Sequence, residues 1–136
     1  MPRFSAAIGG AIILGLVLVQ TPANAALDMV AGARGTAVNA PSTECSTKAK
    51  AALGSVLLNP FEAGEGTGQW MANGPADSDG QTHAAAALHC FPVGKGYVVT
   101  LACAVERPNS TESATDLCGR IEQAFGTDAT GGVTWR

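Results

Sequence analysis

The chain has 136 residues, a formal net charge of −3 and 46% hydrophobic residues, of which few are aromatic. This size suits a single domain, and the mildly acidic balance excludes a general nucleic-acid binder or a protein held on anionic lipid by charge. Because alanine and glycine are plentiful, the core must be built from many small side chains, each burying little area.

The first 25 residues have the parts of a secretory signal peptide in the usual order. Arg3 supplies a positive start, residues 6–19 form an uncharged apolar run, and 23–25 are a small-residue triplet. The run is too short for a membrane-spanning helix, which needs roughly 20 residues. The sequence therefore predicts cleavage after residue 25, an exported protein in the periplasm or outside the cell, and no stable membrane anchor after cleavage. The mature part keeps seven Lys and Arg against eleven Asp and Glu, a charge of −4.

Four cysteines follow: Cys45, Cys90, Cys103 and Cys118. Their spacings of 45, 13 and 15 residues match no common zinc site, and the absence of a C-x-x-C pair argues against a thiol oxidoreductase. In an exported chain, an even number of cysteines indicates structural disulfides. We therefore expect two.

Residues 26–41 show no sustained period and contain two glycines and a proline. We expect a flexible arm there, with a docked edge strand as the alternative. A helix is predicted next, capped by Ser42 or Thr43 and stopped at 59–60 by Asn-Pro. Its apolar positions lie on one face and include Cys45.

Residues 61–80 are rich in glycine and carboxylates and predict loops around a short strand at 69–72. The segment from Asp77 to Gly80 is the nearest match to a calcium loop. The first and last ligand positions of such a loop would be Pro75 and Ala86, neither of which binds calcium. We expect a solvated turn.

A β-hairpin over 82–106 is the central predicted element, with its turn at 94–95. This turn pairs residues whose numbers sum to 189, so Cys90 and Cys103 share a face four residues out of register. At roughly 3.3 Å per residue they lie about 13 Å apart, too far for one disulfide. Each must bond to a cysteine of another element.

A second helix has its apolar positions between Ala114 and Phe125 and includes Cys118. Asn109, Ser110 or Thr111 can cap it, and Gly126 can end it. With two helix and two strand cysteines, we favour the bridges Cys103–Cys118 and Cys45–Cys90. The alternative is Cys45–Cys103 with Cys90–Cys118. The last residues, 133–136, predict either a short edge strand with Trp135 inward or a frayed tail.

Together these elements predict a disulfide-stapled α+β domain over residues 42–136. Two helices cover one face of a small antiparallel sheet built on the hairpin. The other face carries His83, His89, Val98 and Thr100. The two histidines are roughly 20 Å apart along their strand, so they cannot share a metal ion or act as one acid–base pair.

No nucleophile motif or phosphate-binding loop is present, so we expect no cofactor. The leading hypothesis is a non-enzymatic exported module that binds a protein, peptide or glycan. Its candidate surface is the loop with Trp70, Asp77 and Asp79, together with the sheet face around His89. The alternative is a small exported hydrolase or redox enzyme with a site near Asp77, Asp79 and His89.

Overall fold

The computed structural model describes residues 26–74, 82–107, 110, 112–126 and 133–136. The predicted signal peptide at 1–25 lies outside the described residues, and so do Asp77 and Asp79.

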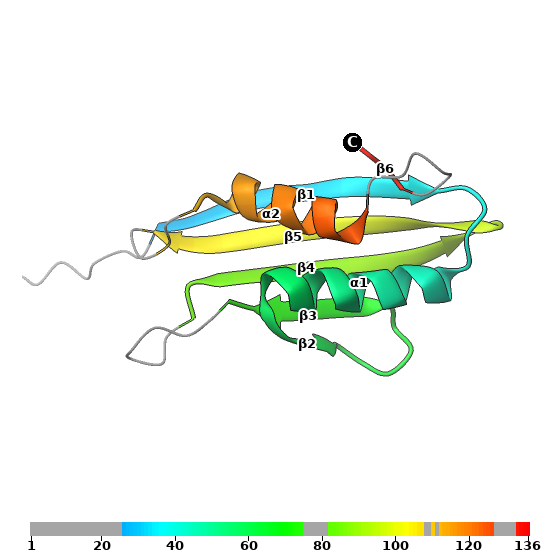
Figure 1. Cartoon of the computed structure of the whole chain (residues 1–136), viewed down its shortest axis with the longest axis horizontal. Coiled ribbons are helices and arrows are strands. Elements are labelled where there is room, and N and C mark those ends of the chain that lie inside the picture. Colours follow the sequence, from blue (N-terminus) through cyan, green and yellow to red (C-terminus); the bar gives the residue numbers. More distant parts are fainter. Residues whose placement is uncertain (1–25, 75–81, 108–109, 111, 127–132) are drawn as a thin grey trace, which may run out of the picture.

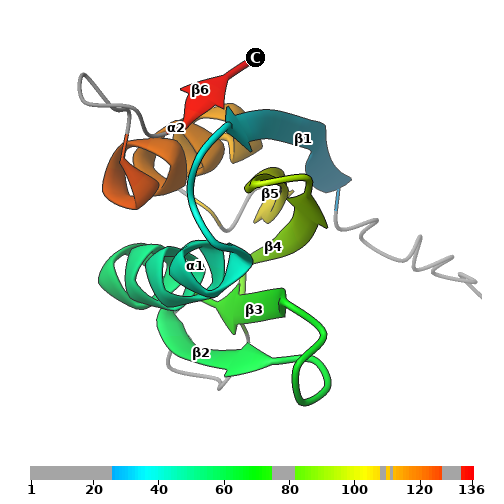
Figure 2. The same ribbon diagram turned by 90° about the vertical axis from the view of Figure 1, so that its right-hand side faces the viewer.

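Six strands form one antiparallel sheet in the order β2-β3-β4-β5-β1-β6, and two helices lie on the same side of it (Figures 1 and 2). The strands are β1 (Ala26–Ala37), β2 (Leu58–Glu62), β3 (Gln69–Asn73), β4 (Ala84–Val93), β5 (Gly96–Arg107) and β6 (Thr134–Trp135). The helices are α1 (Ser42–Val56) and α2 (Ala114–Phe125). The α+β class with two helices on one face is thus confirmed.

The hairpin β4–β5 is the middle of the sheet, and its register is the one that the sequence predicted. Ala84 pairs with Val105 and Val93 with Gly96, so every pair sums to 189. Gly94 at the turn has a φ of 58°, a conformation that glycine adopts without steric cost.

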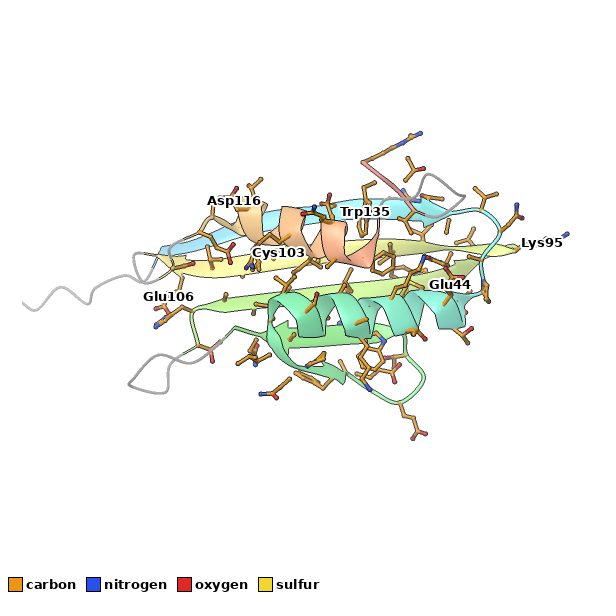
Figure 3. The ribbon with its side chains drawn as sticks, viewed as in Figure 1. Glu44, Lys95, Cys103, Glu106, Asp116 and Trp135 are labelled. Carbon is orange, nitrogen blue, oxygen red and sulfur yellow. A yellow bond between two sulfur atoms is a disulfide. The ribbon has the colours of Figure 1, made fainter. Side chains whose placement is uncertain are left out.

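Two disulfides, Cys45–Cys90 and Cys103–Cys118, tie the helices to this hairpin. This is the pairing that the sequence favoured. Both strand cysteines point to the helix side, and Figure 3 shows Cys103 beneath α2. No cysteine is left free.

The core is the layer between the helices and the sheet, and small side chains fill much of it. Its largest fully buried side chains come from both layers: Tyr97, Leu53, Leu88, Leu101, Leu117 and Ile121. At the end of the chain, Trp135 on β6 packs edge-on against Phe125 of α2, with ring centroids 5.5 Å apart. Of the two predictions for residues 133–136, the short edge strand is the one observed.

The prediction of a flexible arm at residues 26–41 was wrong. These residues form β1, which lies between β5 and β6 and pairs with β5 along its length. The register shifts between Val30 and Ala33, and such a bulge interrupts the alternation by which a strand is recognised. Backbone pairing with β5, formed far along the chain, overrides the weak local signal.

Strand β2 was also not predicted, because Asn59 and Pro60 were expected only to stop the helix. Asn59 adopts a φ of 49°, which the short amide side chain tolerates, and the chain turns directly into the strand. A register shift between Leu58 and Phe61 accompanies this turn.

The helix caps differ from the predicted ones. Helix α1 follows Pro41 and has no side-chain cap, so neither Ser42 nor Thr43 fills this role. Helix α2 is capped by Ser113 rather than by residues 109–111. The Ser113 hydroxyl accepts a hydrogen bond from the Asp116 backbone N–H at 3.1 Å, and the Asp116 carboxylate accepts one from the Ser113 N–H.

Removing this capping box should destabilise the domain measurably. We expect Ser113→Ala to lower the free energy of unfolding by about 1 kcal/mol, because an N–H group of the first turn loses its acceptor. Urea unfolding with both disulfides intact measures the change. Thr115→Ala, in the same exposed turn, is the matched control and should leave stability unchanged or slightly higher. Equal midpoints for the two variants would contradict the capping role.

Candidate functional site: the open face of the sheet

The sheet surface opposite the helices, here called the open face, carries the side chains that alternate with the core positions. In β4 and β5 these are Ala85, Ala87, His89, Phe91, Val93, Val98, Thr100, Ala102, Ala104 and Glu106. No described helix or strand packs over this face. Its centre is therefore a floor of alanines, and its larger side chains gather toward the two ends of the hairpin.

The end nearest the hairpin turn is apolar and exposed. Val38 is 70% exposed, Val93 57% and Phe91 39%; we call these three residues the hairpin-end patch. Val98 lies opposite Phe91 and is nearly buried among its neighbours. Gly96 pairs with Val93, and a Cβ on Gly96 would meet the backbone of Val38. The three residues of the patch thus come from β4 and from just beyond the end of β1, on either side of Gly96.

Beside this patch is an open surface hollow of about 400 Å³, lined by five exposed residues: Arg34, Thr36, Val38, Thr134 and Arg136. We call it the arginine pocket. It forms where the last strand, β6, adds to the edge of β1. Gly35 pairs with Trp135 and Thr36 with Thr134, and Trp135 turns toward the helices. The residues on either side of Gly35 and Trp135 therefore have their side chains on the open face.

His89 lies on the open face between these features and the alanine floor. Its ring contacts the Phe91 ring with centroids 3.9 Å apart, and its cross-strand partners are Thr100 and Gln69. The contact restrains two side chains that would otherwise be free to rotate. His89 thus supports the hairpin-end patch.

The other histidine, His83, meets a carboxylate at the opposite end of the face. Its Nδ1 lies 2.7 Å from Oε2 of Glu106, beside a cavity of about 220 Å³. Figure 3 places Glu106 and Lys95 at opposite ends of β5. The predicted register pairs residues 83 and 106, so this contact could have been predicted from the sequence. The pair joins the start of β4 to the end of β5.

Trp70 lies on the other side of the sheet from His89. It pairs with Leu88, whose side chain is buried under the helices. The ring is half-buried, with the Lys50 ammonium 5.8 Å from its centroid, in a groove of about 660 Å³ beside α1. Trp70 and His89 therefore belong to different surfaces.

No three His, Cys, Asp or Glu side chains of the described residues are grouped closely enough to hold a metal ion. Desolvation raises the pKa of Glu122, which lies on α2 and so away from the open face. None of the helices in the described ranges is both long and apolar enough to cross a bilayer.

The arginine pocket was not predicted from the sequence. Residues 26–41 were expected to form an arm, and residues 133–136 either a strand or a frayed tail. A short alternation was present, however. Thr134 and Arg136 alternate with Val133 and Trp135, as polar and apolar residues do in a half-buried strand.

No protein-family model, curated protein or solved structure matches this chain.

Proposed function

We propose that this protein is an exported, non-enzymatic binding module that docks a partner protein on the open face of its sheet. The observation that carries the proposal is the hairpin-end patch. Three apolar side chains stand exposed together on a face that no described element covers. Contiguous exposed apolar surface rimmed by polar groups is typical of protein interaction sites.

The patch also has the rigidity that favours binding. Phe91 is held by the His89 ring and lies over Val98, and the strands beneath it are tied to the helices by disulfides. An aromatic side chain that is already ordered loses little conformational entropy on binding. Aromatic anchors of this kind contribute a large share of the energy of protein interfaces.

A protein partner fits these features better than a glycan does. Sugar rings are recognised by stacking on accessible aromatic faces. The Trp70 ring is half-buried with Lys50 over it, and the Phe91 ring packs against the His89 ring. Valine and phenylalanine side chains, by contrast, match apolar side chains of another protein.

Export is supported by two features that agree. The sequence predicts a cleaved signal peptide, and all four cysteines form disulfides. Structural disulfides persist in oxidising compartments such as the periplasm or the extracellular space. The alternative of a hydrolase or redox enzyme near Asp77, Asp79 and His89 has less support, because His89 packs on Phe91 and supports the patch.

Site-specific photocrosslinking in the source cell tests this function. We expect p-benzoylphenylalanine in place of Phe91 to form an adduct with a distinct exported protein. The same group in place of Gln123, exposed on α2, should form none. Adding Val38→Asp and Val93→Asp should abolish the adduct while leaving the fold intact, since both side chains are exposed.

Two results would overturn the proposal. One is the absence of an adduct at position 91, and the other is an adduct that persists after both valines are replaced. Intact mass of the secreted protein, measured before and after reduction and alkylation, checks the cleavage site and the two disulfides in the same preparation.

A further inference from the structure

The arginine pocket is lined by two positively charged residues, Arg34 on β1 and Arg136 directly after β6. This arrangement does not favour folding. The Arg34 N–H donates to the Arg136 carbonyl at 3.1 Å, and the Arg136 N–H donates to the Arg34 carbonyl at 2.9 Å. Residues that exchange both hydrogen bonds are directly opposite in an antiparallel pair, with side chains on the same face. Like charges placed directly opposite each other destabilise a sheet.

Of the Asp and Glu side chains that the structure describes, none pairs with these guanidinium groups. Three other cations have partners: Lys48 pairs with Glu44, Arg120 pairs with Glu112, and Lys50 lies over Trp70. Lys95 is exposed at the hairpin turn, away from the arginine pocket. Arg34 and Arg136 form no ion pair within the described part of the chain. A protein with more acidic than basic residues thus has two arginines lining one hollow, neither with an ionic partner among the described residues.

The lining of the pocket suits an anion of modest size. Arg34 and Arg136 provide forked N–H donors that match the two oxygens of a carboxylate. The Thr36 and Thr134 hydroxyls, also in the lining, can donate further hydrogen bonds. A volume of about 400 Å³ lies within the range of small-ligand sites and accommodates an acidic side chain with its neighbouring backbone.

The surroundings indicate what kind of molecule carries the anion. Val38 lines the arginine pocket and also belongs to the hairpin-end patch, so the charged and apolar surfaces are contiguous. A free phosphate ion would use only the first of them. A peptide segment with an acidic residue next to an apolar one would use both.

We infer that the arginine pocket binds an Asp or Glu carboxylate of the partner protein, with a neighbouring apolar side chain of that segment on the hairpin-end patch. This inference rests on the proposed docking function and specifies its chemistry. The partner therefore presents an acidic residue flanked by apolar ones, and complementary charge at such a site sets specificity and register.

Titration of the oxidised full-length mature protein with defined peptides tests the inference. The probe is a terminally blocked Leu-Glu-Leu tripeptide, and the matched control is Leu-Gln-Leu. Backbone amide resonances of Arg34, Thr36 and Thr134 report occupancy by NMR. We expect saturable shifts with the Glu peptide and about tenfold weaker binding of the Gln peptide, because the charged carboxylate acceptor is replaced by a neutral amide oxygen.

Matched charge variants locate the effect. Arg34→Gln and Arg136→Gln should each weaken binding of the Glu peptide about tenfold. Lys95→Gln removes the same charge at the exposed hairpin turn (Figure 3) and should change affinity by about twofold at most. An equal loss from Lys95→Gln would show general charge attraction and overturn the inference.

Other outcomes also decide the matter. Equal binding of the Gln peptide, or the absence of saturable shifts, would refute carboxylate recognition. Saturation by inorganic phosphate at lower concentrations than by the Glu peptide would refute a peptide ligand. Because the titration uses no natural partner, its failure alongside an intact crosslink at position 91 refutes only the carboxylate site. Saturable peptide binding without that crosslink refutes the docking function instead.

Discussion

Removing the Cys45–Cys90 disulfide should lower the free energy of unfolding by about 4 kcal/mol, against about 3 kcal/mol for the Cys103–Cys118 disulfide. The bridges close chain segments with sequence separations of 45 and 15 residues. In the chain-entropy model, a longer closed loop restricts the unfolded chain more. Either loss is a large fraction of the 5–15 kcal/mol that typically stabilises a domain.

Urea unfolding of the paired alanine variants measures these losses. Cys45 and Cys90 are replaced together in one protein, and Cys103 and Cys118 in the other, so that no free thiol forms a new bridge. Both sites are small and buried, so alanine leaves similar cavities in the two variants. A larger loss from the Cys103–Cys118 variant would show that unfolded-chain entropy does not set the order.

Gly96→Ala should destabilise the domain by about 3 kcal/mol, near the upper end of the usual cost of overpacking. A Cβ at this position would overlap the carbonyl oxygen of Ala37 and come within 2.8 Å of the Val38 backbone. These obstacles are backbone atoms of β1 and the residue that follows it. To relieve the overlap, the backbone at the end of β1 must move away from β5.

Gly119→Ala is the control for this substitution. Gly119 lies on the exposed side of α2, and nothing lies within 4 Å of a Cβ added there. Alanine should therefore raise stability by about 1 kcal/mol through its higher helix propensity. Urea unfolding compares the two variants, and a loss below about 0.5 kcal/mol for Gly96→Ala would place it among ordinary surface substitutions and contradict the close approach.

The features of this protein that depend on local periodicity could be predicted from the amino-acid sequence. The spacing of apolar residues placed Cys45 and Cys118 on the buried faces of two helices. The turn at residues 94–95 set the hairpin register, and the pleat then put Cys90 and Cys103 on one face. These positions limited the disulfides to two arrangements, and the favoured one is observed. Helical and strand periods operate over a few residues, so they are visible in the chain alone.

The way in which the flanking segments complete the sheet depends on long-range strand pairing and could not be predicted locally. Strand β1 has only a weak local strand pattern. Its backbone groups pair with β5, which the chain reaches only after helix α1 and the three strands β2, β3 and β4. Gly35 illustrates the reason. A Cβ there would collide with the side chains of Val133 and Val99, which come from two other elements. Such a constraint does not exist until those elements meet.

The candidate site was decided in the same way. The hairpin register alone places His89 on the open face, and the same register pairs it with Thr100. The arginine pocket required β1 and β6 to pair, which brings residues 34 and 136 together from opposite ends of the described chain. Local sequence patterns specify which face a side chain takes, whereas long-range strand pairing determines which side chains share a site.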